Sequence, residues 1–454
     1  MRRIVSVLTA LVLATLTLSP AAAAGAPDWP DRLVGHGGPV KSVAISPDGR
    51  QALTGAFDYA VILWALEGEE GRVVHRMIGH EAAVNDAVFV PGADRAVSAS
   101  DDGTVGLWDL ASGTLIKRFS AGGGEKVLDV AVSPDGRLAA SAGWDKVVRV
   151  YDLERETEIA AFKGHRGNVN SVAFSPDSTH LYSASYDGTV RLWDVVSLRP
   201  VRIIHDHGWG LNVVRALPGG SLILTGSLDG AVSIVFVDTG ETVIDLERHE
   251  RPILSAAIDA EEGLAAIGDG SGLIRVYSTA GWEPLEEHES GFGPVWGMAF
   301  ADQGRRLYHV GLDDYAISWQ ISPRKPFEAV QSQFPRRFQK AKTDDPGELQ
   351  FARKCSICHT LTPGDANRAG PSLYGLFGRE AGTLPGYPYS DALLNSTIVW
   401  TDETIAHLFD AGPDVVTPGT KMPVQRIKKP GDLKALVAYL KRVTAPAREE
   451  DKRQ

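Results

Sequence analysis

Hydrophobic and polar residues alternate in short segments through most of the chain before residue 324. Thr189 to Trp193, for example, reads Thr-Val-Arg-Leu-Trp, the pattern of a strand with one buried face. Asp-Gly pairs at 187–188 and 229–230 break the alternation where hairpin turns are expected. Residues 25–323 are therefore predicted to form an all-β module.

This pattern repeats every 42–44 residues. Most copies carry a His 22 residues before a central Asp, a Ser or Thr four residues before it, and an aromatic residue six residues after it. The central positions are Asp58, Asp102, Asp145, Asp187, Asp229, Ser271 and Asp314. Repeats of about 40–45 residues predict four-stranded propeller blades, here seven. We expect Asp31–Val34 to supply the outer strand of the last blade and so close the ring.

The register resembles the WD-repeat family, most closely at Gly79-His80 with Trp108-Asp109. The resemblance implies a tetrad of His, Ser or Thr, Asp and Trp in each blade, which satisfies buried polar groups without water. The sixth unit is expected to be degenerate at Ser271 and Ile267, and the seventh at Val310 and Gln320. His205-Asp206-His207 could suggest a metal site, but His207 already fills a tetrad position, which favours a structural role.

The only two cysteines, Cys355 and Cys358, lie in the sequence Cys-Ser-Ile-Cys-His. This is the c-type haem attachment motif. Each cysteine can form a thioether with one haem vinyl group, and the adjacent His359 can then direct its imidazole at the iron. The alternative, a redox Cys-x-x-Cys pair, needs no following His and normally belongs to a thioredoxin-like context that is lacking here.

Met422 is the only methionine near this motif and lies in Pro-Gly-Thr-Lys-Met-Pro. A lone Met is usually core filler, but beside a haem motif it is the candidate sixth ligand. The predicted metal ligands are thus His359 and Met422. His/Met ligation raises the reduction potential and closes the iron to small molecules.

Residues 346–443 resemble class I cytochrome c, an all-α domain. The resemblance implies that the Pro371 carbonyl accepts the Nδ1 hydrogen of His359. It also implies that Tyr389 and Trp400 donate hydrogen bonds to a haem propionate, whose charge Arg379 offsets. Thr401 is expected to cap a helix, and Gly347 to let the first helix approach the last, whose apolar stripe is Leu433, Leu436, Val437 and Leu440. The chain departs from the family pattern at Leu393 and Leu408. These departures bear on the reduction potential of the haem and not on the identity of the iron ligands.

The ends of the chain and its charge complete the domain map. Arg2-Arg3, an apolar run from Ile4 to Leu18 and the alanines before residue 25 predict a signal peptide at 1–24 and a periplasmic location. The alternative is an uncleaved membrane anchor, although the run is shorter than a membrane span of about 20 residues. Residues 324–345 are predicted to be a basic linker, and residues 444–454 a charged tail. Net charge is −18 for residues 25–323 and −11 overall, which argues against nucleic-acid binding.

These features predict a periplasmic one-electron carrier with one covalent haem c. We expect redox protein partners to dock on the propeller and the haem edge, with no membrane span in the mature chain and no catalytic site of its own. One alternative is a subunit of a periplasmic oxidoreductase whose propeller binds a further cofactor or catalytic partner; another is a haem-based sensor or scaffold. Basic residues around Met422 are expected either to dock on the acidic propeller or to steer an acidic partner: Lys421, Arg426, Lys428 and Lys429.

Overall fold

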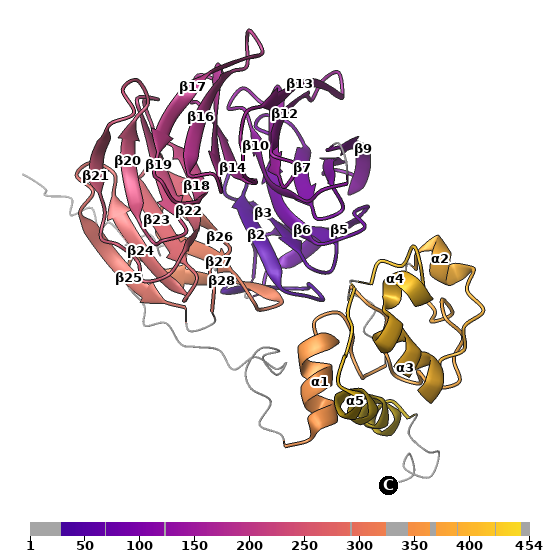
Figure 1. The fold of residues 1–454 in the computed structure, drawn as a ribbon. Coiled ribbons are helices and arrows are strands. Elements are labelled where there is room, and N and C mark those ends of the chain that lie inside the picture. Colours follow the sequence, from indigo (N-terminus) through magenta and orange to yellow (C-terminus); the bar gives the residue numbers. More distant parts are fainter. Residues whose placement is uncertain are drawn as a thin grey trace, which may run out of the picture.

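The computed structural model describes residues 29–68, 70–121, 124–290, 293–323, 344–363, 369–387, 389–422 and 424–445. Its strands form seven four-stranded antiparallel sheets that precede a helical domain (Figure 1). The innermost strand of each sheet packs on that of the next, and β26 packs on β2, so the sheets form a closed ring. The seven-bladed propeller predicted from the repeat is confirmed. The predicted signal peptide, nearly all of the predicted linker and most of the charged tail lie outside the described residues.

Each of the first six blades consists of four strands that are consecutive in the sequence. The first three are β2 (Val40–Ile45), β3 (Gln51–Ala56), β4 (Ala60–Ala65), β5 (Arg72–Ile78); β6 (Val84–Phe89), β7 (Arg95–Ser100), β8 (Thr104–Asp109), β9 (Thr114–Ser120); and β10 (Val127–Val132), β11 (Leu138–Gly143), β12 (Val147–Asp152), β13 (Thr157–Lys163). The next three are β14 (Val169–Phe174), β15 (His180–Ser185), β16 (Thr189–Asp194), β17 (Arg199–Asp206); β18 (Leu211–Ala216), β19 (Leu222–Ser227), β20 (Val232–Phe236), β21 (Thr242–Asp245); and β22 (Ile253–Asp259), β23 (Leu264–Asp269), β24 (Leu273–Ser278), β25 (Pro284–Glu289).

The seventh blade combines the two ends of the propeller sequence. Its strands are β26 (Gly297–Ala301), β27 (Arg306–Val310), β28 (Tyr315–Gln320) and, on the outside, β1 (Arg32–Val34). Leu33 pairs with Ala316 and is fully buried, and the Tyr308 hydroxyl donates to the Pro30 carbonyl at 2.6 Å. The expected closure by the segment at 31–34 is confirmed.

Hydrogen-bonded tetrads stabilise the hairpin turns within the blades. In the second blade, His80 Nδ1 lies 2.9 Å from Asp102 and its Nε2 lies 2.7 Å from Ser98 Oγ. Trp108 Nε1 donates to the same Ser98 hydroxyl at 2.7 Å. Burial alone would raise the pKa of Asp102, but the hydrogen bond and charge of His80 hold it well below its usual range. The carboxylate is therefore an ionised acceptor for the buried turn.

Two blades use partners that the repeat register did not predict. In the sixth blade, His249 Nδ1 lies 3.0 Å from the carboxylate of Asp269. Ser271 occupies the position where the repeat predicts the acid, and its backbone N–H donates to Asp269. The unit is degenerate at the Ser271 position, as expected, but it keeps a His–Asp pair because the acid lies two residues earlier in the turn. In the third blade, Arg149 donates to Asp145 at 2.5 Å.

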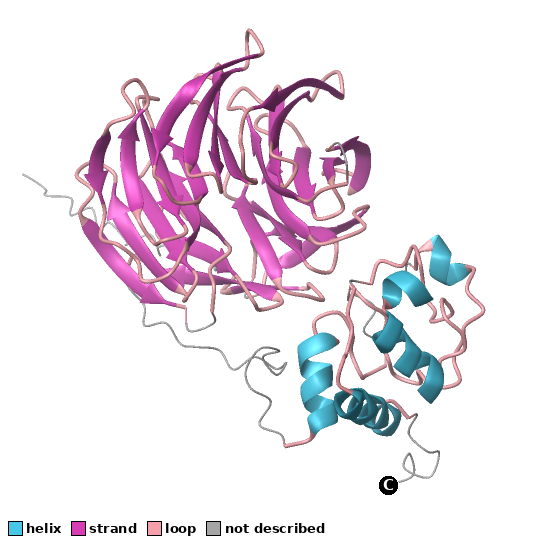
Figure 2. Cartoon of the chain, in the orientation of Figure 1, coloured by secondary structure: helices cyan, strands magenta, loops and turns pink. Residues whose placement is uncertain are grey.

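The C-terminal domain of the structure is helical (Figure 2). Its helices are α1 (Pro346–Lys354), α2 (Asp391–Leu394), α3 (Asp402–Ala411), α4 (Pro413–Val416) and α5 (Pro430–Val443). A Cβ on Gly347 of α1 would lie 2.3 Å from the Ala435 carbonyl oxygen of α5, so only glycine permits this close helix crossing. Thr401 caps α3 and accepts from Thr404 N, as expected. Within the described residues, no helix is long and apolar enough to cross a membrane.

The first prediction concerns the stability that closure of the ring gives to the propeller. Leu33→Ala should lower the free energy of unfolding of the propeller by about 2–5 kcal/mol, because it leaves a cavity beneath the outer strand of the last blade. Val34→Ala, in the same strand but 40% exposed, is the matched control and should change stability by less than about 0.5 kcal/mol. Urea unfolding followed by circular dichroism measures both. Equal effects would contradict the packing described here.

A second prediction concerns His309 in β27. Burial, reinforced by His288, lowers the pKa of His309 to about 3. Unfolding releases the ring to its ordinary pKa of about 6.5, so below that pH the unfolded chain binds a proton that the folded propeller excludes. This site should therefore reduce the free energy of unfolding by up to about 1.4 kcal/mol per pH unit as pH falls from about 6.5 toward the folded pKa.

His309→Gln keeps a polar side chain of similar size that does not titrate. Urea unfolding between pH 7 and pH 4 should show a shallower dependence on pH in this variant, whatever its stability at pH 7. An unchanged slope would mean that His309 binds its proton equally well in both states.

Candidate functional site

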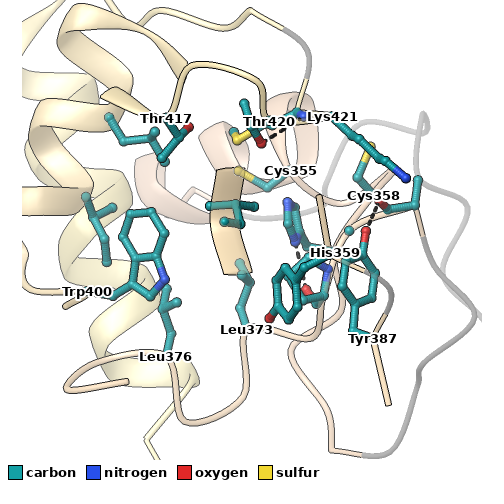
Figure 3. A pocket seen from close by; sticks show the side chains of 18 of the residues that line it. Cys355, Cys358, His359, Leu373, Leu376, Tyr387, Trp400, Thr417, Thr420 and Lys421 are labelled. Carbon is teal, nitrogen blue, oxygen red and sulfur yellow. Dashed lines mark hydrogen bonds between the residues drawn. The ribbon is translucent and has the colours of Figure 1, made fainter. Parts of the chain in front are cut away.

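A cavity lies largely within the helical domain. Its walls come from the end of α1, the loop at 369–376, helix α3 and the loop at 417–422. Figure 3 shows side chains projecting into it from opposite sides, with Trp400 and Leu376 on one side and His359 and Tyr387 on the other. All the site residues proposed from the sequence line it: Cys355, Cys358, His359, Pro371, Arg379, Tyr389, Trp400 and Met422.

The chain turns immediately after α1 and brings the Cys-x-x-Cys-His sequence to the cavity. Cys355 N donates to Phe351 O at 2.9 Å, and His359 N donates to Cys355 O at 2.9 Å. The two cysteines face the same space without forming a disulfide. Burial, and then the neighbouring Cys358, raises the pKa of Cys355 to about 12, so its side chain is a neutral thiol.

His359 is held by a single backbone acceptor. Its Nδ1 lies 2.7 Å from the Pro371 carbonyl oxygen. A carbonyl can only accept, so Nδ1 carries the hydrogen and Nε2 carries the lone pair. Burial lowers the pKa of His359, which keeps the ring neutral. A Cβ on Gly370 would lie 2.4 Å from the imidazole Cε1, so glycine is needed for this approach.

Met422 reaches the cavity from the loop that follows α4. Thr417 Oγ1 donates to the Pro413 carbonyl at 3.1 Å, which ties the start of this loop to the helix. Met422 N donates to Thr420 Oγ1 at 3.2 Å, which fixes the backbone beside the thioether. The cavity therefore contains one imidazole nitrogen and one thioether sulfur, a donor pair used by haem proteins.

Arg379, Tyr389 and Trp400 form a polar part of the lining. The Arg379 guanidinium donates to the carbonyl oxygens of Ser372 and Tyr374 at 2.8 and 2.9 Å. Trp400 N donates to Arg379 O at 3.0 Å, so the two residues are held as a backbone pair. Burial raises the pKa of Tyr389, which leaves its hydroxyl protonated and able to donate.

Two tyrosines of the lining were not identified from the sequence. Tyr387 donates its hydroxyl hydrogen to the Ala369 carbonyl, and the Pro-Gly-Tyr-Pro-Tyr segment offered a signal for it. Tyr59 belongs to the propeller and lies 362 positions from Lys421; no local motif could have indicated it.

The cavity fits a covalently attached haem. Two thiols three positions apart face the same space, a neutral imidazole has its lone pair on Nε2, and the Met422 thioether lines the same cavity. The remaining lining is largely apolar and includes Leu373, Leu376, Leu393, Ile405, Leu408 and Phe409. A largely apolar cavity of this kind suits a large planar ligand. Among the described residues, no group of three His, Cys, Asp or Glu side chains could hold a separate metal ion.

Comparisons with known proteins agree with the division of the chain into a propeller and a helical domain. Residues 30–65, 71–109, 113–152 and 156–194 match the family described as WD domain, G-beta repeat. Residues 345–444 match the cytochrome c family. Cytochrome c of Sesamum indicum is 44% identical over 99 residues, which cover 22% of this chain and 88% of that protein. Cytochrome c2 of Blastochloris viridis is 42% identical over 105 residues, which cover 23% of this chain and 82% of that protein.

The two thiols generate a third prediction. Cys355→Ala combined with Cys358→Ala should abolish haem staining of the denatured chain on an electrophoresis gel, because both sulfur atoms that can bond covalently are gone. The single variant Cys355→Ala is the control and should keep some stain through Cys358. Staining that survives the double change would show that other residues attach the haem.

Proposed function

Because the chain belongs to the cytochrome c family through residues 345–444 and carries WD40 repeats before them, we propose that it is an exported one-electron carrier with class I haem ligation. The domain binds a covalent haem c with iron and functions in electron transfer. When bound, the haem iron alternates between its ferric and ferrous states and so carries one electron. The proposal rests chiefly on the convergence of Cys355, Cys358, His359 and Met422 on one cavity.

We assign the axial ligands to His359 Nε2 and the Met422 sulfur. The Pro371 carbonyl orients the imidazole through Nδ1 and raises its basicity, as outer partners of ligating histidines do. Arg379, Tyr389 and Trp400 face the propionates in this assignment. Leu393 and Leu408 make the lining less polar, which favours the less charged, reduced iron.

The remaining assignments concern location and domain limits. We propose that residues 1–24 are a signal peptide, which directs the chain to the periplasm. The propeller then comprises residues 25–323, the linker 324–345, the cytochrome domain 346–443 and the tail 444–454.

We propose that the propeller is a platform for a redox partner. Support comes from large exposed aromatic side chains at its blade turns: Trp144, Tyr186 and Trp209. Trp144 and Tyr186 occupy equivalent hairpin positions of adjacent blades, and Trp209 lies in the connection that follows β17. Aromatic residues are enriched in protein interfaces, and an acidic propeller would favour a basic partner.

Met422 provides the fourth prediction and the test of this proposal. Met422→Ala should abolish the weak near-infrared absorption of the ferric protein that arises from sulfur-to-iron ligation. It should also open the iron to cyanide or carbon monoxide and lower the reduction potential. Val424→Ala, an exposed site in the same loop, is the control and should leave the spectrum unchanged. An unaltered spectrum in Met422→Ala would assign the sixth position to another residue.

A further inference from the structure

One side chain of the propeller lies in the haem cavity of the cytochrome domain. Tyr59, in the hairpin between β3 and β4 of the first blade, lines this cavity together with Cys358, Tyr387 and Lys421. Its hydroxyl donates to the Lys421 carbonyl oxygen at 3.4 Å. Lys421 directly precedes Met422, so the contact reaches the backbone of the proposed sulfur ligand.

The surroundings of the Tyr59 ring are those of an interface and not of a solvent-exposed turn. Burial raises the pKa of Tyr59 well above its usual value, and the Cys358 thiol and the Tyr387 hydroxyl act in the same direction. The hydroxyl is therefore protonated. It can donate its hydrogen to an acceptor such as the Lys421 carbonyl oxygen. Tyr59 thus lies on the side of the cavity where the second haem-attaching cysteine is located.

The backbone at Tyr59 is unusual for so large a residue. Its φ is 69°, in the left-handed region that favours glycine. The equivalent hairpin position holds glycine in four other blades, with φ of 79° at Gly103, 87° at Gly188, 86° at Gly230 and 109° at Gly272. The first blade therefore keeps a tyrosine at a position where four of its sister blades hold glycine. Strained residues that persist often serve a function, and here the side chain has a contact that glycine cannot make.

The contact does not depend on the basic residues expected to drive docking. Of these residues, Arg426 pairs with Asp414 at 2.8 Å inside the cytochrome domain. Lys421 contributes its main-chain carbonyl to Tyr59 and not its ammonium group. A neutral hydroxyl–carbonyl bond and an aromatic ring at the cavity edge therefore form this part of the interface.

We propose that Tyr59 docks the propeller on the Lys421–Met422 segment of the same chain and covers the cavity edge at Cys358. Tyr59 is then a positioning residue for the haem site that is supplied by the propeller. It steadies the loop of the proposed sulfur ligand through one carbonyl and shields the haem edge with its ring. A redox partner that approaches this edge must displace the first-blade hairpin or receive the electron elsewhere. The shielding part of the proposal rests on the proposed haem function, whereas the docking part does not.

Three variants of the full chain test the proposal. Tyr59→Gly installs the residue of the sister hairpins and removes both ring and hydroxyl without adding backbone strain. Tyr59→Phe keeps the ring and removes the hydrogen bond. Lys146→Gly is the matched control, because Lys146 holds the same hairpin position in the third blade with φ of 68°. Tyr59→Gly and Lys146→Gly relieve the same left-handed backbone strain, so urea unfolding of the propeller should change by similar amounts in these two variants, which separates docking from folding.

Hydrogen exchange followed by mass spectrometry reports the docking. Peptides containing Lys421 should exchange about fivefold faster in Tyr59→Gly and in Tyr59→Phe, the factor expected for loss of one neutral hydrogen bond. Lys146→Gly should leave these peptides unchanged. Exchange that is equal in Tyr59→Gly and the parent chain, or equally raised in Lys146→Gly, would overturn the docking.

Reduction of the ferric haem by ascorbate reports the shielding. The rate should rise in Tyr59→Gly and remain near the parent value in Tyr59→Phe, because only glycine exposes the edge. An unchanged rate in Tyr59→Gly would overturn the shielding. If Met422→Ala shows that another residue binds the iron while Tyr59→Gly still accelerates exchange, the ligand assignment fails and the docking stands.

Discussion

The hydrogen bond from His359 Nδ1 to the Pro371 carbonyl is the constraint on which the cavity depends. Its length of 2.7 Å fixes the plane and the tautomer of the ring, and so determines where the Nε2 lone pair lies. The bond requires the loop at 369–371 to pass directly over the imidazole, and Gly370 permits this passage. It also requires the turn after α1, which presents Cys355, Cys358 and His359 to one space. The position of α1 is in turn set by its close crossing with α5 at Gly347.

The propeller and the cytochrome domain satisfy their buried polar groups in different ways. In five blades of the propeller, an Asp carboxylate pairs with a His and accepts from turn backbone of the same blade. In the cytochrome domain, main-chain carbonyl oxygens are the acceptors. Pro371 accepts from His359, and Ser372 and Tyr374 accept from Arg379. Neutral acceptors leave the haem cavity without buried negative charge, which is compatible with a cofactor whose own charge changes by one unit in each cycle.

Periodicity predicted the propeller well because each blade is specified by short-range contacts. His80, for example, bonds both Ser98 and Asp102, which lie only 18 and 22 residues after it in the sequence. The same reasoning did not locate the acid of the sixth blade. A two-residue shift inside one turn moves the acid from the Ser271 position to Asp269 without changing the repeat length. For the helical domain, the attachment motif and Met422 indicated the cavity, and family resemblance supplied the lining residues Arg379, Tyr389 and Trp400. Tyr59 could not be foreseen, since its contact joins positions 362 residues apart that no repeat or motif relates.

A propeller is well suited to supply such a contact. Its blades interact mainly with their neighbours, so a substitution in one hairpin leaves the other six blades unchanged. The hairpin turns of the blades are therefore positions where the repeat can be varied independently, as glycine at 103, 188 and 230 and tyrosine at 59 illustrate. The cytochrome domain has no comparable freedom, because its loops at 369–376 and 417–422 are fixed by the cavity that they enclose. Any adaptation between the two halves of the chain is thus expected to fall on the propeller side, and a bulky residue in a left-handed turn is the form that such an adaptation takes.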